Sequence, residues 1–192
     1  MTYIQKDFSH LKGLAGFSDA LLDMHFTLYA GYVANTNALS EQMAQAAKGT
    51  PSFAELRRRF GWEFNGMRLH ELYFGNLSKD STSSSDAPLL VERLTKAFGS
   101  VAQWEEDFRA CGAMRGIGWV VLAYDRESDT LFNTWINEHD LGHLAGAVPI
   151  AVMDVFEHAF ITEYGLDRAA YMDAFIAGLD WHVCEERLTT AS

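Results

Sequence analysis

The sequence predicts an α+β protein in which a long N-terminal helical hairpin packs on a C-terminal α/β domain with a small three-stranded antiparallel sheet. Two observations predict the hairpin: apolar side chains recur at helical spacing over two long stretches, and Gly49-Thr50-Pro51 interrupts them. A third observation predicts the sheet, because the helical period gives way after residue 118 to short β-rich runs.

The first helix of the hairpin is expected to run from Ser18 to about Lys48, as one helix or with a break. Ser18 is a good N-cap, and Asp19 places a negative charge in the first turn, where the helix dipole favours an anion. The second helix is expected from Pro51 to about Leu72, with the proline in the first helical position after a threonine cap.

A serine-rich segment, residues 78–87, contains no large apolar side chain and is the best candidate for a domain boundary. It predicts a helical hairpin domain at residues 1–87 and an α+β domain at residues 88–192. Two short helices then follow from Pro88, with a break near Gly99.

Three strands are expected in the C-terminal part of the chain. Residues 119–124 and 130–136 are β-rich runs joined by a polar turn, which is a hairpin signal. Residues 148–153 form a third run with Pro149 near its start, where a missing N–H donor is tolerated. From Phe156 onward the pattern is helical.

Composition limits the classes of partner. The chain has 192 residues, 15 Lys+Arg and 26 Asp+Glu, and the resulting net charge of −11 argues against nucleic acid and against a membrane surface. The hydrophobic content of 48% is that of a packed globule, and no apolar run approaches the roughly 18 residues of a membrane span. Two cysteines make no disulfide framework, and the absence of a visible secretory signal predicts the cytoplasm.

Two histidines on the hairpin suggest a metal site. His25 lies in the middle of the first predicted helix and His70 lies late in the second, both among apolar neighbours. Either histidine alone is explained as an ordinary buried side chain. Two inward histidines on the two arms of a hairpin can face each other, which is how helical bundles build metal sites.

A third candidate element is the segment from Asp154 to His158, where a predicted strand ends and a helix begins. The two residues are four apart, so on a helix they can share a face, whereas Glu157 points elsewhere. Three imidazoles and one carboxylate, with no cysteine ligand, favour redox-active iron or manganese over a structural zinc site.

These residues carry a family resemblance. The segment DVFEHAFITEYG, followed by Arg168 and Tyr171, resembles the DVWEHAYYxDY…R…Y segment of iron/manganese superoxide dismutases, with Phe156 in place of the usual tryptophan. Looser resemblance extends over nearly the whole chain, at His25 with the segment from Tyr32 to Asn37, at His70 with Tyr73 and Phe74, and at Gly118-Trp119.

The resemblance implies a cytoplasmic antioxidant oxidoreductase that converts superoxide to O₂ and H₂O₂. The ligands carried over are His25, His70, Asp154 and His158, which would hold one iron or manganese per subunit between the two domains, with iron slightly favoured. It also implies a homodimer or homotetramer. Two alternatives remain on the same scaffold: a metal-dependent oxygenase or peroxidase, and a non-catalytic interaction protein.

Five further residues receive site roles from the resemblance. Tyr32 matches the gateway tyrosine and is expected to face the metal. His139 matches the outer-sphere glutamine and is expected to hydrogen-bond both a metal-bound solvent and Tyr32. Trp119 is expected to line the site, and Glu157 to reach the metal-ligand histidine of a second subunit across a two-fold interface. Arg168 is expected to supply positive potential to the substrate funnel.

Three departures from the family pattern carry their own expectations. The spacing from His25 to Tyr32 is seven residues instead of eight, which predicts a regular helix without a bulge. Tyr29 stands where the family has a gateway histidine that hydrogen-bonds to the tyrosine matched by Tyr164 on the other subunit. Gly66 occupies one glutamine position and leaves His139 at the other, as in a minority branch with iron or mixed metal preference.

The remaining histidines and tryptophans have weaker roles. His10, His143 and His182 match no ligand position and are expected on the surface or in packing. Trp62, Trp119, Trp135 and Trp181 are expected in the core or pocket wall, with Trp119 and Trp181 the better candidates to line a narrow site.

Overall fold

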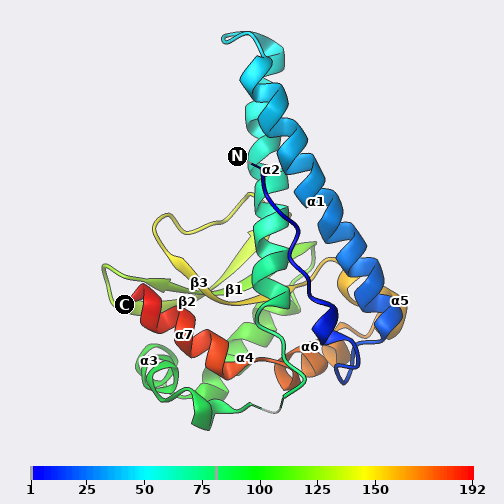
Figure 1. The fold of residues 1–192 in the computed structure, drawn as a ribbon. Helices are drawn as coiled ribbons and strands as arrows, with labels where there is room; N and C mark the ends of the chain where they lie inside the picture. Colours follow the sequence, from blue (N-terminus) through cyan, green and yellow to red (C-terminus); the bar gives the residue numbers. More distant parts are fainter. Residues whose placement is uncertain (1, 81) are drawn as a thin grey trace.

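The computed structural model describes residues 2–80 and 82–192. Two long antiparallel helices form a hairpin that extends beyond the rest of the molecule, and a small sheet and several short helices gather at its base (Figure 1). The predicted fold class is confirmed. Among the described residues, every helix is too short or too polar to cross a membrane.

The hairpin consists of α1 (Asp19–Gln45) and α2 (Pro51–Phe74). The Ser18 side chain accepts a hydrogen bond from the N–H of Leu21, which satisfies one of the free donors of the first turn. At the second helix the Thr50 side chain accepts from Phe53, and Pro51 occupies the first turn. The first helix is continuous along its length and ends three residues before Lys48.

The C-terminal part contains α3 (Pro88–Phe98) and α4 (Val101–Gly112), then the three strands, and finally a helical region. The strands are β1 (Gly118–Asp125), β2 (Thr130–Asn137) and β3 (Val148–Asp154), in the order β2-β1-β3 with both pairings antiparallel. The helical region comprises α5 (Ile161–Tyr164), α6 (Arg168–Ala177) and α7 (Trp181–Ala191). One-turn 3-10 helices lie at Ser9–Leu11, Ser84–Asp86 and Glu157–Ala159.

The hairpin joins the sheet through the end of α2, which packs against β3. The buried amide of Asn76 accepts from the N–H of Val152 at 2.7 Å, so the chain that leaves α2 is tied to the third strand. Arg187 of α7 donates to the carbonyl oxygens of Leu72 and Ile150, both at 2.9 Å. These bonds fix the position of α2 relative to the strand that carries Asp154.

The expected placement of Asp154 and His158 on one helical face is wrong. Asp154 is the last residue of β3, and His158 lies in the 3-10 turn Glu157–Ala159. The two side chains still meet, because the chain turns back at Phe156, whose N–H donates to Asp154 Oδ1 at 2.8 Å. A reversal of the backbone at Phe156, and not a helix, therefore brings the side chains of Asp154 and His158 together.

Candidate metal centre

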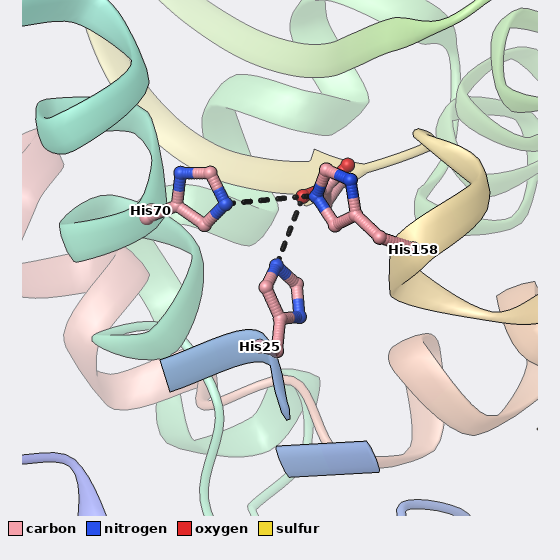
Figure 2. Close-up of side chains that lie close together, drawn as sticks. His25, His70 and His158 are labelled. Carbon is pink, nitrogen blue, oxygen red and sulfur yellow. Dashed lines mark hydrogen bonds and ion pairs between the residues drawn. The ribbon is translucent and has the colours of Figure 1, made fainter. Parts of the chain in front are cut away.

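Four side chains far apart in the sequence converge at the base of the hairpin. His25 from α1, His70 from α2, Asp154 from the end of β3 and His158 from the following turn each offer one ligand atom, and these four atoms all lie within 4.8 Å of one another. Figure 2 shows the three imidazoles entering from three separate segments and pointing toward one another. The structure thus brings together all four residues that the sequence singles out.

Asp154 lies at the centre of the cluster and is fully buried. Its Oδ2 is 3.2 Å from Nε2 of His25, 3.1 Å from Nε2 of His158 and 3.7 Å from Nε2 of His70. His25 and His70 are also buried, whereas the His158 side chain is 23% exposed. One carboxylate oxygen therefore faces three imidazole nitrogens in a site largely closed to solvent.

His70 is oriented for coordination by its other ring nitrogen. Nδ1 of His70 donates to the carbonyl oxygen of Gly66 at 2.6 Å, which fixes the neutral tautomer with a lone pair on Nε2. That Nε2 is buried and has no hydrogen-bond partner among the described residues. A buried nitrogen that points into a cluster of donors without a partner is expected where a metal ion completes the site.

Burial and neighbouring groups shift the pKa values of three donors in the cluster, His25, His70 and Asp154. Burial lowers the pKa of His25, and burial together with the neighbouring His25 lowers the pKa of His70 well below its usual value. Burial acts to raise the pKa of Asp154, but the facing His158 and His25 outweigh it and hold that pKa well below its usual value. Neutral imidazoles and an ionised carboxylate are the forms that bind a metal.

The donor set fits iron or manganese. Three imidazole nitrogens and one carboxylate oxygen suit a redox-active divalent or trivalent ion of the first transition row, and no sulfur donor belongs to the described cluster. The four side chains come from two helices, a strand end and a turn, so the fold itself assembles the site.

A pair of hydrogen-bonded side chains lies beside the cluster. Nε2 of His139 is 2.8 Å from the hydroxyl of Tyr32, and the indole N–H of Trp119 donates to Nδ1 of His139 at 3.0 Å. The Tyr32 ring stacks on His70 with 5.1 Å between centroids. The seven-residue spacing thus keeps Tyr32 on the side of a continuous α1 that faces the cluster, as the sequence predicts.

The tautomer of His139 follows from its partners. An indole N–H can only donate, so Nδ1 of His139 is the acceptor and the neutral ring carries its proton on Nε2. Burial lowers the pKa of His139 to about 4, which keeps the ring neutral at pH 7. The Nε2–H therefore donates to the Tyr32 oxygen, and the hydroxyl proton of Tyr32 is free to bond elsewhere.

Two residues near His139, Trp62 and Glu138, were not predicted from the sequence to bind metal or hold a proton. The Trp62 ring lies 4.5 Å from the His139 ring and 5.7 Å from the Tyr32 ring, and its N–H donates to Glu138 at 3.1 Å. Trp62 was expected only in the core or pocket wall. Its position on α2, eight residues or about two helical turns before His70, was the available sign that it lies near the site.

Trp181 instead packs on Trp104, so the expectation that it lines the site is wrong.

Two predicted site residues, Glu157 and Arg168, lie outside the four-residue cluster. Glu157 is exposed on the turn beside His158. The Arg168 guanidinium donates to the carbonyl oxygens of Gly112, Met114 and Gly116, and it lies over the Phe160 ring. Its hydrogen bonds therefore hold the loop before β1. From the sequence, Arg168 was expected only to supply positive potential, and these bonds were not predicted.

Tyr29, at the position of the usual gateway histidine, lies beside the cluster, with its ring stacked on His70 at 6.4 Å between centroids, but its hydroxyl has partners outside the cluster. Its hydroxyl donates to Glu71 at 3.0 Å and accepts from the N–H of Lys6, also at 3.0 Å. Tyr164 is engaged as well, because its hydroxyl donates to the carbonyl of Gly16 in the same chain. Both tyrosines hold the N-terminal segment in place.

Of the histidines without an assigned role, His143 and His182 have local partners. Nε2 of His143 is 2.9 Å from the carbonyl oxygen of His139, and Nε2 of His182 is 3.3 Å from Glu186. Their side chains lie outside the four-residue cluster.

A helical hairpin packs on a small antiparallel sheet, and a cluster of three histidines and one aspartate lies between them. This arrangement is that of a metalloprotein with a site for a single ion. Residues 86–187 match the family model of the C-terminal domain of iron/manganese superoxide dismutases. The chain is 34% identical to an iron superoxide dismutase of Cupriavidus metallidurans, over 93% of this chain and 91% of the relative.

Two further relatives extend the comparison. The chain is 34% identical to a manganese superoxide dismutase of Haloferax volcanii, over 82% of this chain and 79% of the relative, and 31% identical to an iron superoxide dismutase of Aquifex pyrophilus, over 95% and 90%. The chain belongs to the iron/manganese superoxide dismutase family. The predicted family, the enzyme class and the choice of iron or manganese as cofactor are confirmed.

Proposed function

We propose that this chain disproportionates superoxide at an iron or manganese ion held by His25, His70, Asp154 and His158. The observation that carries the proposal is the convergence of these four donor atoms within 4.8 Å, in a buried site where Nε2 of His70 has no partner among the described residues. A structural role alone would leave no reason to bury an unpaired imidazole nitrogen next to a carboxylate.

The bound metal would supply the one-electron chemistry by which two superoxide ions and two protons give O₂ and H₂O₂. Asp154 contributes the single negative charge among the four donors and so lowers the net charge of the loaded site. The Gly66 carbonyl fixes the tautomer of His70 and thereby the direction of its lone pair.

The pair of Tyr32 and His139 would hold the proton that the reaction consumes. His139 Nε2–H donates to the Tyr32 oxygen, which directs the hydroxyl proton of Tyr32 toward an anion in the site. Burial raises the pKa of Tyr32, so its hydroxyl stays protonated at neutral pH. Trp119 would act through His139, because its N–H selects the tautomer that makes this direction possible.

A second copy of the chain would complete the site. The His158 side chain is the most exposed of the four ligand candidates, and the exposed Glu157 is adjacent to it. In a homodimer or homotetramer related by a two-fold axis, Glu157 of each chain would accept a hydrogen bond from the free ring nitrogen of His158 in the other. Glu157→Ala is expected to weaken the dimer, measured by sedimentation velocity.

Three further predictions belong with this function. The hairpin at residues 1–87 and the α+β part at residues 88–192 would be separate units that meet at the metal, which limited proteolysis of metal-loaded and metal-depleted protein can test. Arg168 would act on the funnel through its charge, and Arg168→Gln tests this by the salt dependence of kcat/KM. A cytoplasmic, antioxidant role is tested by fractionation and by growth under superoxide stress.

The decisive experiment is reconstitution of the protein with iron and with manganese separately, followed by a superoxide-consumption assay. Dismutation that scales with one metal per chain supports the proposal. A metal-loaded protein that does not consume superoxide would contradict it, and oxidation of an organic substrate by that protein would favour the oxygenase or peroxidase alternative. A chain that binds neither metal would favour a non-catalytic interaction protein.

A further inference from the structure

The loop that presents His139 is short and conformationally constrained. The N–H of Asn137 donates to the carbonyl of Leu141 at 2.7 Å, and the N–H of Leu141 donates back at 3.3 Å, so only three residues lie in the turn. Glu138, directly before His139, has a φ of 50°. This left-handed conformation is uncommon for a residue with a side chain and persists only when neighbouring contacts enforce it.

The side chain of Glu138 makes such a contact. Its Oε2 accepts a hydrogen bond from the indole N–H of Trp62 at 3.1 Å, which links helix α2 to the loop. The Trp62 ring also packs edge-on against His139, with 4.5 Å between centroids, and lies 5.7 Å from the Tyr32 ring. Trp62 thus touches both members of the hydrogen-bonded pair and the residue that presents one of them.

Trp62 is itself held on its helix. The Arg59 guanidinium lies 4.1 Å from the Trp62 ring centroid, in a cation–π arrangement. Arg59 donates two hydrogen bonds to Glu63 Oε1, at 2.8 and 2.6 Å, and Asn35 of α1 donates to the other oxygen of the buried Glu63 at 3.3 Å. The contacts therefore run from α1 through α2 to the loop and return to Tyr32 on α1.

We propose that the bond between Trp62 and Glu138 is a clasp that positions His139 against Tyr32, so that Trp62 and Glu138 are positioning residues for the proton-holding pair. The expected effect of the clasp on turnover rests on the proposed function. Without the clasp, the left-handed Glu138 is held by backbone bonds alone, among them its N–H to the carbonyl oxygen of Ile117 at 3.1 Å, and His139 turns away from the Tyr32 hydroxyl for part of the time. Proton delivery slows, whereas the entry of superoxide does not change.

The test uses three variants of the metal-loaded enzyme. Trp62→Phe keeps an aromatic ring against Tyr32 and His139 but removes the N–H donor. Glu138→Ala removes both the acceptor oxygen and the negative charge. Glu138→Gln also removes the charge but keeps an acceptor oxygen. Glu127→Ala, an exposed acid in the β1–β2 turn, is the matched control for the loss of a surface charge.

Amide hydrogen exchange of residues 137–141 is measured by mass spectrometry, beside kcat and kcat/KM. We expect Trp62→Phe and Glu138→Ala each to raise exchange about tenfold in this segment and to lower kcat about fivefold, with kcat/KM nearly unchanged. Glu138→Gln and Glu127→Ala should match the wild type. Hydrogen exchange reports on the clasp even if the wild-type protein fails to consume superoxide, so the two proposals fail separately.

Two results would overturn the clasp. Unchanged exchange of residues 137–141 in both Trp62→Phe and Glu138→Ala would show that other contacts hold the loop. Equal losses in Glu138→Gln and Glu138→Ala would show that the charge of Glu138 acts and not its hydrogen bond.

Discussion

The metal cluster and the His139 loop lie side by side but are built differently. His25 and His70 stand on two long helices, and Asp154 closes a strand paired along its length with β1. His139 stands in a three-residue turn, next to a residue with a left-handed backbone, and its ring is fixed by side chains of other elements. Regular structure thus places three of the four ligand candidates, whereas side-chain contacts place His139, the group that we propose holds the proton. Substitutions should therefore affect metal retention in the first region and turnover in the second.

The largest effect is expected at the centre of the cluster. Asp154→Asn removes the only negative charge among the four donors, and the affinity for iron and manganese should fall by more than the roughly 10- to 100-fold typical of outer partners of a metal site. Metal content after dialysis, measured by mass spectrometry, checks this. Glu106→Gln, at an exposed position of α4, is the control. Full metal retention in Asp154→Asn would break the assignment of this residue.

A smaller effect is expected behind the cluster. Tyr171 donates from its hydroxyl to the carbonyl oxygen of Asp154 at 2.6 Å, and both groups are buried. Tyr171→Phe leaves that carbonyl without this donor, which should lower the free energy of unfolding by about 1–3 kcal/mol. Thermal denaturation of the metal-loaded protein measures the loss. A midpoint equal to that of the wild type would mean that the bond contributes nothing to holding Asp154.

The pH dependence of stability distinguishes the His139 region. Burial lowers the pKa of His139 to about 4, whereas an unfolded histidine titrates near 6.5. Between these two pKa values His139 is protonated in the unfolded state and neutral in the folded state. The stability that neutral His139 supplies is therefore present above pH 6.5 and is lost as the pH falls toward 4. Between pH 7 and pH 5, His139→Gln should lose less free energy of unfolding than the wild type, by about 2 kcal/mol.

Urea unfolding at the two pH values, with each protein in the same metal-loaded state, measures this difference. His182→Gln, which removes an exposed histidine of α7, is the control for the loss of an imidazole. Equal slopes for His139→Gln and the wild type would contradict the neutral, buried state of His139.

The smallest effect is expected at Tyr29. Its ring stacks on His70, but its hydroxyl is bonded to Glu71 and to the N–H of Lys6 and not to a residue of the cluster. Tyr29→Phe should cost about 1 kcal/mol of stability and leave kcat and kcat/KM within about twofold of the wild type. A larger fall in turnover would show that Tyr29 still serves the gateway despite its contacts.

The convergence of His25, His70 and Asp154 could be predicted from the sequence because regular elements carry these three residues. His25 and His70 face inward on helices whose caps at Ser18 and Thr50 are visible in the sequence, and the order of the strands places Asp154 beside them. The spacing of four residues predicted the pairing of Asp154 with His158, and the family resemblance supported it. The turn that brings His158 to Asp154 was mistaken for a helix, because a spacing of four residues is also met when the chain reverses.

The surroundings of His139 could not be predicted in the same way. The left-handed Glu138 occupies a position where glycine or asparagine would have been the expected signal. The contact between Trp62 and Glu138 spans 76 positions in the chain, and no local pattern indicates such a pair. Trp181 was misplaced for the same reason, since its partner Trp104 is defined only by how α4 packs against α7.

The most direct test of the central claim is an anomalous-scattering measurement at the iron and manganese absorption edges, on crystals of protein reconstituted with each metal. We expect one peak per chain, bounded by Nε2 of His25, His70 and His158 and by a carboxylate oxygen of Asp154. A peak elsewhere, or well-ordered crystals of catalytically active protein without a peak at this position, would contradict it.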